Sequence, residues 1–264
     1  MKEKHVIKKF PKSRYGTIDL GKISRKKHNI AALLEIDVTD AWLKIEKLKK
    51  KKMQISFTSW FIYCIADSLK NHKEVCGYLY KKNSRIIFDT ISISLMVEKN
   101  ISGTKVPLPL LIQNADSKTA IEICKEIQNG KNSEVKSSND YVINNKLSGF
   151  LTNLYFNLPG FLRIFSMNCL LNNPFQSKKV MGNVLFTSLG SAALMPGWII
   201  PKTYHNLSFA LGSVTMKPWV AKKQIKPRQI AHLTIIANHD VADGAPIARF
   251  ASDLICKLEK ANGL

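Results

Sequence analysis

Apolar and polar residues alternate with two different periods along this chain, and the two periods predict interleaved strands and helices. Short runs rich in β-branched and aromatic residues predict strands, and apolar residues that recur every three to four positions predict helices. Strands and helices mixed in this way indicate an α/β layered fold. The predicted strands cover residues 33–38, 85–98, 106–112, 184–188, 207–214 and 232–238. The predicted helices begin at Thr39 or Asp40 (ending near Lys51), at Ser56 or Thr58, at Ser117 (toward Gln128) and close before Pro246, which suits a first turn.

Residues 150–171 (FLTNLYFNLPGFLRIFSMNCLL) form the most apolar stretch, with Arg163 as its only charge. About 20 apolar residues can span a bilayer, so the length alone would allow it. However, the pair Pro159-Gly160 breaks the run and three asparagines interrupt it. We favour a helix packed against the domain or against a neighbouring subunit, and contact with a membrane surface is the less favoured interpretation. The polar residues 129–140 before this stretch predict a loop.

The chain is long enough for one large domain, and its charge is strongly positive. We expect a single domain over residues 1–264, because a chain with 45% apolar residues can bury a sizeable core. The net charge of +21 favours anionic partners, which include nucleic acid, an anionic membrane surface and phosphorylated cofactors. Nucleic acid is disfavoured, because aromatic residues are not interleaved with the basic ones as base stacking requires.

The five cysteines are scattered, without a Cys-x-x-Cys pair, so we expect no zinc site and no other metal site. Unpaired thiols are typical of a reducing compartment. No apolar run of signal-peptide length follows the basic N-terminus. We therefore expect a cytoplasmic protein.

The segment with the strongest chemical signal is residues 233–250 (LTIIANHDVADGAPIARF). A buried type of strand runs into His239, a turn contains Asp243 and Gly244, and a helix follows. A strand end would hold the imidazole rigidly, which suits a catalytic base. A single histidine is nevertheless more often a structural residue, so the pattern alone leaves both interpretations open.

The spacing His239-x-x-x-Asp243-Gly244 resembles the active-site motif of the acyltransferase superfamily that includes chloramphenicol acetyltransferase and the catalytic domains of dihydrolipoamide acyltransferases. Other segments are similar to that family in the same order, so the resemblance covers nearly the whole chain. They are residues 18–28 (an N-terminal strand and an arginine-containing segment), 34–39, 106–115 and 182–190 (strands) and APIARFASDL (the last helix).

The resemblance implies a two-layer α/β sandwich around a mixed sheet and a homotrimer whose active sites lie between subunits. One subunit would supply His239 and its neighbour a hydroxyl, from Thr187 as first choice or Ser188 as second. A thiol with a pKa of about 8.5 is mostly protonated at neutral pH, so His239 would act as general base. The hydroxyl would stabilise the oxyanion formed when the thiolate attacks a thioester of coenzyme A.

Two further residues are implied to support the site. Asp243 would form an ion pair with Arg25 and so orient the turn after His239. Gly244 would allow a backbone conformation that a Cβ disfavours.

The chain also departs from the family. No sequence for a lipoyl domain or a subunit-binding domain is expected in it, so a lipoyl group would come from a partner protein and none is carried covalently. Asn238 and Asp240 flank the histidine where lipoamide enzymes usually have Asp and Arg. An alternative function is therefore a non-catalytic trimeric scaffold or partner-binding protein. A third is binding to nucleic acid or to a membrane surface through residues 150–171.

Overall fold

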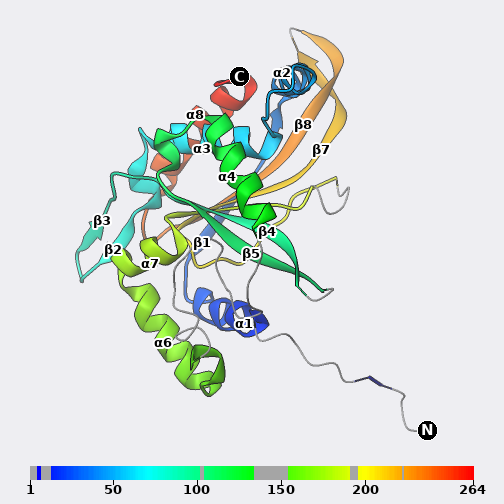
Figure 1. The fold of residues 1–264 in the computed structure, drawn as a ribbon. Coiled ribbons are helices and arrows are strands. Elements are labelled where there is room, and N and C mark those ends of the chain that lie inside the picture. Colours follow the sequence, from blue (N-terminus) through cyan, green and yellow to red (C-terminus); the bar gives the residue numbers. More distant parts are fainter. Residues whose placement is uncertain (1–4, 7–12, 102–103, 134–153, 191–195, 222) are drawn as a thin grey trace.

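Six strands form one mixed sheet in the order β1-β8-β7-β6-β4-β5 (Figure 1). This computed structural model describes residues 5–6, 13–101, 104–133, 154–190, 196–221 and 223–264. Neighbouring strands run antiparallel except for the pairs β4/β6 and β6/β7, which are parallel. The strands are β1 (Asn29–Asp37), β4 (Ile93–Ile101), β5 (Thr104–Ile112), β6 (Val184–Ser188), β7 (Leu207–Ala221) and β8 (Gln224–Asn238).

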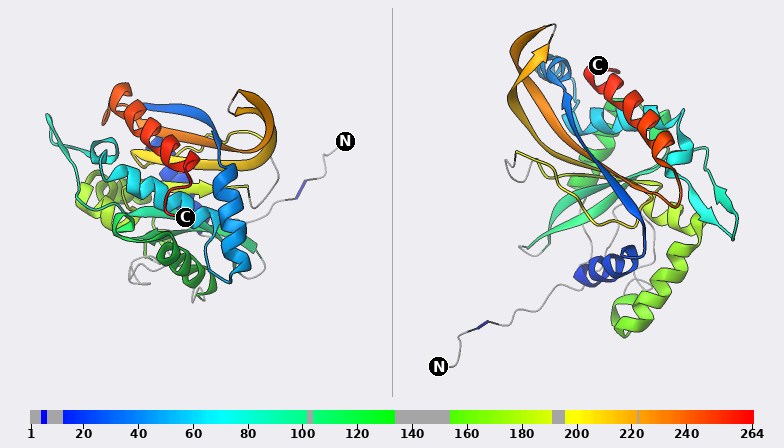
Figure 2. Two further views of the ribbon diagram at one scale, coloured as in Figure 1. Left: turned by 90° about the horizontal axis from the view of Figure 1, so that it is seen from above. Right: turned by 180° about the vertical axis from the view of Figure 1, so that it is seen from behind.

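Helices cover one face of this sheet and enclose the core with it (Figure 2). They are α2 (Thr39–Lys50), α3 (Phe57–Leu69), α4 (Ala120–Asn132) and α8 (Gly244–Glu259). Large aromatic side chains at the centre of the layer interface are fully buried, among them Trp60, Phe61, Phe186, Phe209 and Phe250. The arrangement confirms the predicted two-layer α/β sandwich with a mixed sheet.

The opposite face of the sheet is also buried, but it carries several polar side chains. Because side chains alternate along a strand, the residues between the core positions of β8 point to this face, including His232 and Thr234. Segment 196–206 contacts it through Trp198, whose ring lies edge-on to His232 with 5.0 Å between ring centroids. The Trp198 Nε1 donates to the Leu34 carbonyl oxygen at 2.9 Å, which fixes the segment to strand β1.

Local sequence explains where most helices begin. Ser56, one of the two predicted caps, begins α3, and it forms a reciprocal capping box with Ser59. The predicted cap at Ser117 is wrong, because Ser117 belongs to the short 3-10 helix η2 (Ala115–Ser117) and Thr119 caps α4 instead. Helix α2 begins at Thr39, where the Asp37 carboxylate accepts the Thr39 backbone N–H at 3.0 Å.

The predicted single strand over residues 85–98 is wrong. A separate two-stranded sheet, β2 (Tyr78–Tyr80) with β3 (Ser84–Ile86), follows the 3-10 helix η1 (Lys73–Cys76), and β4 begins only at Ile93. Side chains distant in sequence interrupt the run. Asp116 accepts the Ile91 backbone N–H and Asn183 accepts that of Ser92, each at 2.9 Å.

The strand expected in the N-terminal segment is also wrong. Residues 18–28 do not contain a strand, because helix α1 (Ser13–Ser24) occupies most of them and β1 starts at Asn29. The predicted loop 129–140 is partly wrong, because α4 continues to Asn132, and its remainder from 134 lies outside the described residues.

Strands β7 and β8 are longer than predicted and form a projecting two-stranded ribbon, here called the β-ribbon (residues 216–221 and 224–229). Neither β1 nor β6 extends along the β-ribbon. The pairing of β1 with β8 ends at Ile230, and the pairing of β6 with β7 ends at Leu211. One face of the β-ribbon exposes Met216, Val220 and Ile225.

Helices α6 (Gly160–Asn172) and α7 (Pro174–Met181) occupy much of the apolar stretch and the residues after it. Helix α6 packs on α1, where the Arg163 Nε donates to the buried Asp19 carboxylate at 2.9 Å. This confirms the favoured prediction of a helix packed on the domain for residues 160–171. Among the described residues, no helix combines the length and apolar character needed to cross a bilayer.

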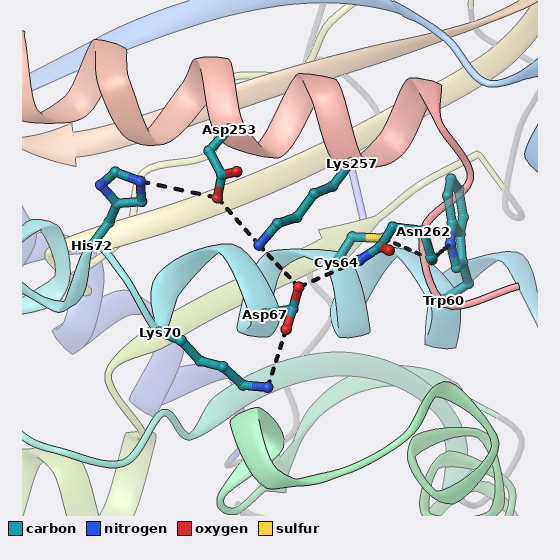
Figure 3. Close-up of polar contacts among 8 residues, drawn as sticks. All are labelled: Trp60, Cys64, Asp67, Lys70, His72, Asp253, Lys257 and Asn262. Carbon is teal, nitrogen blue, oxygen red and sulfur yellow. Dashed lines mark hydrogen bonds and ion pairs between the residues drawn. The ribbon is translucent and has the colours of Figure 1, made fainter.

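A charged network fastens α8 to α3 (Figure 3). The Lys257 ammonium lies between Asp67 (2.9 Å) and Asp253 (3.2 Å), and Lys70 adds a second cation to Asp67. The network raises the pKa of Lys257, because hydrogen bonds from its ammonium to the two carboxylates outweigh the effect of burial. It holds the helix that follows the His239 turn.

Candidate active site

His239 is the first residue beyond strand β8, at the end of the sheet nearest α1. Its backbone N–H donates to the His28 carbonyl oxygen at 2.8 Å, and the preceding Asn238 N–H donates to the Asn206 carbonyl oxygen at 2.8 Å. Asn238 pairs with Asn29 in the β1/β8 ladder, so continuing that register places His28 opposite His239. The His239 side chain is exposed, which leaves its imidazole accessible to a substrate or to a neighbouring chain.

A compact turn joins His239 to helix α8. The Asn238 carbonyl oxygen accepts the backbone N–H groups of Val241 (3.0 Å) and Ala242 (3.3 Å), and Arg85 donates to the Val241 carbonyl oxygen at 3.1 Å. The Asn238 side-chain oxygen also accepts the Asp240 backbone N–H at 3.2 Å. The turn is therefore fixed mainly by Asn238.

The predicted supports of this turn are not found as expected within the chain. Asp243 and Arg25 are both exposed and form no ion pair with each other in the described structure. Arg25 follows directly on the end of α1, and Asp243 occupies the N-cap position of α8 without a side-chain cap bond. Gly244 is the first residue of α8, its φ is not positive, and a Cβ there would meet no atom within 4 Å. Glycine is therefore not required at that position by this chain alone.

The carboxylate that engages a basic partner here is Asp240. Its Oδ1 lies 2.9 Å from the His28 Nδ1. The pKa of His28 is raised, first because Asp240 accepts this hydrogen bond and second because of the carboxylate charge. The motif resemblance gave no role to His28, and the unusual Asp240 was the only signal of this pair in the sequence.

Lys27 and Asn206 form a polar cluster with Asn238, the residue that precedes His239. The Lys27 Nζ donates to the Asn206 Oδ1 at 2.5 Å, and the Asn238 Nδ2 donates to the same oxygen at 3.2 Å. The Lys27 ammonium also lies 4.0 Å from the centre of the Tyr204 ring. Burial lowers the pKa of Lys27 to about 8, although the charge of Asp240 acts in the opposite direction. Sequence reasoning did not identify this cluster.

Thr187 and Ser188 end strand β6 and are half-buried. Val184 and Phe186 point into the core, so Thr187 points to the polar face of the sheet and Ser188 toward the helices. The structure therefore places the two candidate hydroxyls on opposite faces.

Thr187 and His239 are far apart within one chain. Thr187 pairs with Ala210, which pairs with Thr234, and Thr234 precedes His239 by five residues along β8. At about 3.3 Å per residue this offset is about 16 Å along the strands, and two strand spacings of about 4.8 Å add to it. A single chain therefore cannot bring both side chains to one reacting carbonyl.

The described residues include no group of three or more histidine, cysteine, aspartate or glutamate side chains able to hold a metal ion. The site thus offers an accessible imidazole, a hydrogen-bonded histidine–aspartate pair and a basic polar cluster, on a two-layer α/β sandwich. The fold and the site together place this protein among α/β proteins that carry an accessible histidine at the end of a strand.

The sequence profile of one family matches most of the chain. The family is described as 2-oxoacid dehydrogenases acyltransferase (catalytic domain), and the matched residues are 22–138 and 200–264. The chain belongs to this family and is an acyltransferase catalytic domain of the 2-oxoacid dehydrogenase type. The match includes His239 and Asp243 but leaves out residues 139–199, which contain Thr187 and helix α6. No curated protein matches the chain significantly.

Solved structures show the same fold at low sequence identity. A probable dihydrolipoamide acetyltransferase from Listeria monocytogenes is 17% identical with a TM-score of 0.68, covering 98% of this chain and 96% of its own. A truncated catalytic core of the 2-oxoacid dehydrogenase multienzyme complex from Thermoplasma acidophilum is 16% identical with a TM-score of 0.65, covering 98% and 100%. The dihydrolipoamide acetyltransferase of Azotobacter vinelandii is 15% identical with a TM-score of 0.66, covering 97% and 92%.

Proposed function

We propose that this protein transfers an acyl group between coenzyme A and a thiol of the lipoyl type, or another small acceptor, at sites formed between subunits of a homotrimer. The observation that carries the proposal is the position of His239 within the range that the family profile matches, at a strand end fixed by backbone hydrogen bonds and with an exposed side chain. The structure of the Azotobacter vinelandii enzyme addresses the catalytic role of a serine, a histidine and an asparagine. That asparagine follows its histidine by four positions, as Asp243 follows His239.

The offset between Thr187 and His239 supports a site shared by two copies. A neighbouring copy that presents its own Thr187 to His239 would supply the hydroxyl that one chain cannot place there. The exposed apolar face of the β-ribbon supports assembly, because such a surface on a projecting ribbon is typical of contact with another chain. One relative forms the cubic core of the pyruvate dehydrogenase multienzyme complex, and copies of a related fold therefore do assemble.

In the proposed reaction, the neutral imidazole of His239 removes the proton of the attacking thiol. The thiolate forms a bond to the thioester carbonyl carbon, and Thr187 donates a hydrogen bond to the resulting oxyanion. Collapse of this intermediate breaks the bond to the first sulfur, which leaves as a thiolate and takes the proton from His239. We choose Thr187 over Ser188 because it points to the polar face of the sheet.

Charge and sequence support the proposed substrates. The net charge of +21 favours an anionic acyl donor such as acyl-coenzyme A. A lipoyl acceptor would be carried by a partner protein. We also propose a cytoplasmic location, which the five unpaired cysteines support.

The first test measures thiol-dependent release of coenzyme A from a panel of acyl-coenzyme A compounds. We expect His239→Ala to lower the rate by about 10²- to 10⁴-fold while the fold and oligomeric mass are retained. His5→Ala, an exposed histidine near the N-terminus, is the matched control and should keep the wild-type rate. Absence of turnover in the wild type across the panel would favour the non-catalytic scaffold.

The second test mixes two inactive chains, His239→Ala and Thr187→Val, by joint refolding. If each site combines His239 from one copy with Thr187 from the next, about a quarter of the interfaces regain both residues on random mixing. Restored activity supports the shared site. No restoration in mixtures of proven composition would contradict it. Comparing Thr187→Val with Ser188→Ala identifies the donor, with an expected loss on the order of 10²- to 10³-fold for Thr187.

A further inference from the structure

Helix α6 turns its apolar side outward. Its exposed residues recur at helical spacing and form one stripe, here called the α6 face. Phe161 and Phe165 are 72% and 66% exposed, so little of either side chain is covered by the part of the chain that the structure describes. The α6 face consists of Phe161, Leu162, Phe165, Cys169 and Leu170. The opposite side of α6 packs on α1 through Arg163 and Asp19.

The two helices that contact α6, which are α1 and α7, carry no exposed acidic residue. Residues 141–239 contain no aspartate or glutamate. The one acidic residue on helices α1, α6 and α7 is Asp19, which is buried and paired with Arg163. The exposed charged residues on these three helices are therefore all basic: Arg14, Lys22 and Lys179. An apolar helix face whose neighbouring helices carry exposed cations complements an anionic surface that has an apolar interior.

The α6 face offers few hydrogen-bonding groups to a specific protein partner. Protein interfaces make on average about one hydrogen bond per 100–200 Å². The polar residue lying within the stripe is Ser166, and its hydroxyl already donates to the Arg163 carbonyl oxygen at 2.9 Å. Phenylalanine and leucine side chains without such groups suit the boundary between lipid headgroups and acyl chains.

We propose that the α6 face docks this protein on an anionic lipid surface, with α6 lying in the plane of the interface. The basic residues of α1 and α7 contact the headgroups, and the two phenylalanines enter the apolar boundary. The family profile does not match this segment. It goes beyond the proposed acyl transfer and does not depend on it.

The chain offers a matched pair of probe sites. Cys169 lies in the α6 face, while Cys256 lies on α8 in the helix layer, and both are exposed; the other three cysteines are buried. An environment-sensitive fluorophore is attached to Cys169 in a Cys256→Ser background, and to Cys256 in a Cys169→Ser background. Vesicles of phosphatidylcholine with and without phosphatidylglycerol are added at low and high salt.

We expect a blue shift of the Cys169 probe with the anionic vesicles only, weakened by salt, and no shift of the Cys256 probe. In flotation assays, the double substitution Phe161→Ser and Phe165→Ser should lower the vesicle partition coefficient by on the order of 100-fold. Leu43→Ser is the control, because Leu43 is an exposed leucine on α2, at the opposite end of the molecule (Figures 1 and 2). This control should bind as the wild type does.

Three results would overturn the proposal. The wild type does not bind anionic vesicles, or the double variant binds as well as the wild type. Alternatively, the Cys169 probe is shielded without lipid and the double variant has a smaller oligomeric mass, which would make the α6 face an interface between copies. Failure of acyl transfer in the enzymatic test affects none of these measurements, so the two proposals can fail separately.

Discussion

Replacing Gly182 by alanine should destabilise the strand that carries Thr187. Gly182 ends helix α7 and precedes β6 with φ 73° and ψ 179°, a region of backbone conformation that essentially only glycine adopts. A Cβ there would lie 2.5 Å from the Ser92 carbonyl oxygen. The substitution therefore adds backbone strain and a steric clash at one point.

The surrounding hydrogen bonds hold the backbone in place, so it cannot move away from the added Cβ without losing a bond. The Ser92 carbonyl oxygen accepts the backbone N–H groups of Asn183 (2.9 Å) and Val184 (3.3 Å), and Tyr78 donates to the Gly182 carbonyl oxygen at 2.8 Å. The backbone strain costs about 1–3 kcal/mol and the clash or the loss of one of these bonds about 1–2 kcal/mol more. The lower entropy of the unfolded alanine chain offsets about 0.5–1 kcal/mol. We expect a net loss of about 3 kcal/mol.

Urea denaturation followed by tryptophan fluorescence and circular dichroism measures this loss. Gly21→Ala is the matched control, because Gly21 lies inside α1 and a Cβ there meets no atom within 4 Å. That change should stabilise by about 0.5–1 kcal/mol. If Gly182→Ala changed the free energy of unfolding by less than about 1 kcal/mol, the assigned backbone conformation of Gly182 would be wrong.

Three further predictions concern charge. Asp240→Asn should lower the pKa of His28 in an NMR titration, because the hydrogen bond and the charge of Asp240 raise that pKa. The contribution of this pair to folding stability is present at low pH and is lost as pH rises through the His28 pKa. An unchanged pKa would contradict the pair. Burial lowers the pKa of His205 to about 4, so stability should fall by on the order of 3 kcal/mol as pH drops from about 6.5 to 4, and urea unfolding of His205→Gln should show a flatter pH dependence. Arg163→Met should cost about 3–5 kcal/mol in the docking of α6, and hydrogen exchange should show part of it recovered when Asp19→Leu is added; no recovery would mean that the pair is not the cause.

Sequence alone predicts those elements whose causes are local. The cap at Ser56, one of the two predicted candidates, and strand β6 depend on residues within a few positions, and both are confirmed. The run 85–98 has strand composition throughout, yet Asp116 and Asn183 bind its backbone from later in the chain and divide it. No local pattern contains that information.

The candidate site divides in the same way. His239 could be predicted because its motif is contiguous and a strand end fixes it. The cluster of Lys27 with Asn206 joins residues 179 positions apart, and only the folded sheet brings them together. The pair of Arg25 with Asp243 was inferred from the family, but the two exposed side chains form no ion pair with each other in the described structure.

The five-residue offset between Thr187 and His239 has a consequence for the cell. If the proposed site is shared between copies, a correctly folded but isolated subunit would hold only half of it and would be inactive. Specific activity would therefore rise steeply with subunit concentration near the dissociation constant of the assembly and become constant only above it. Expression level would then act as a threshold, below which the chain is present but performs no chemistry.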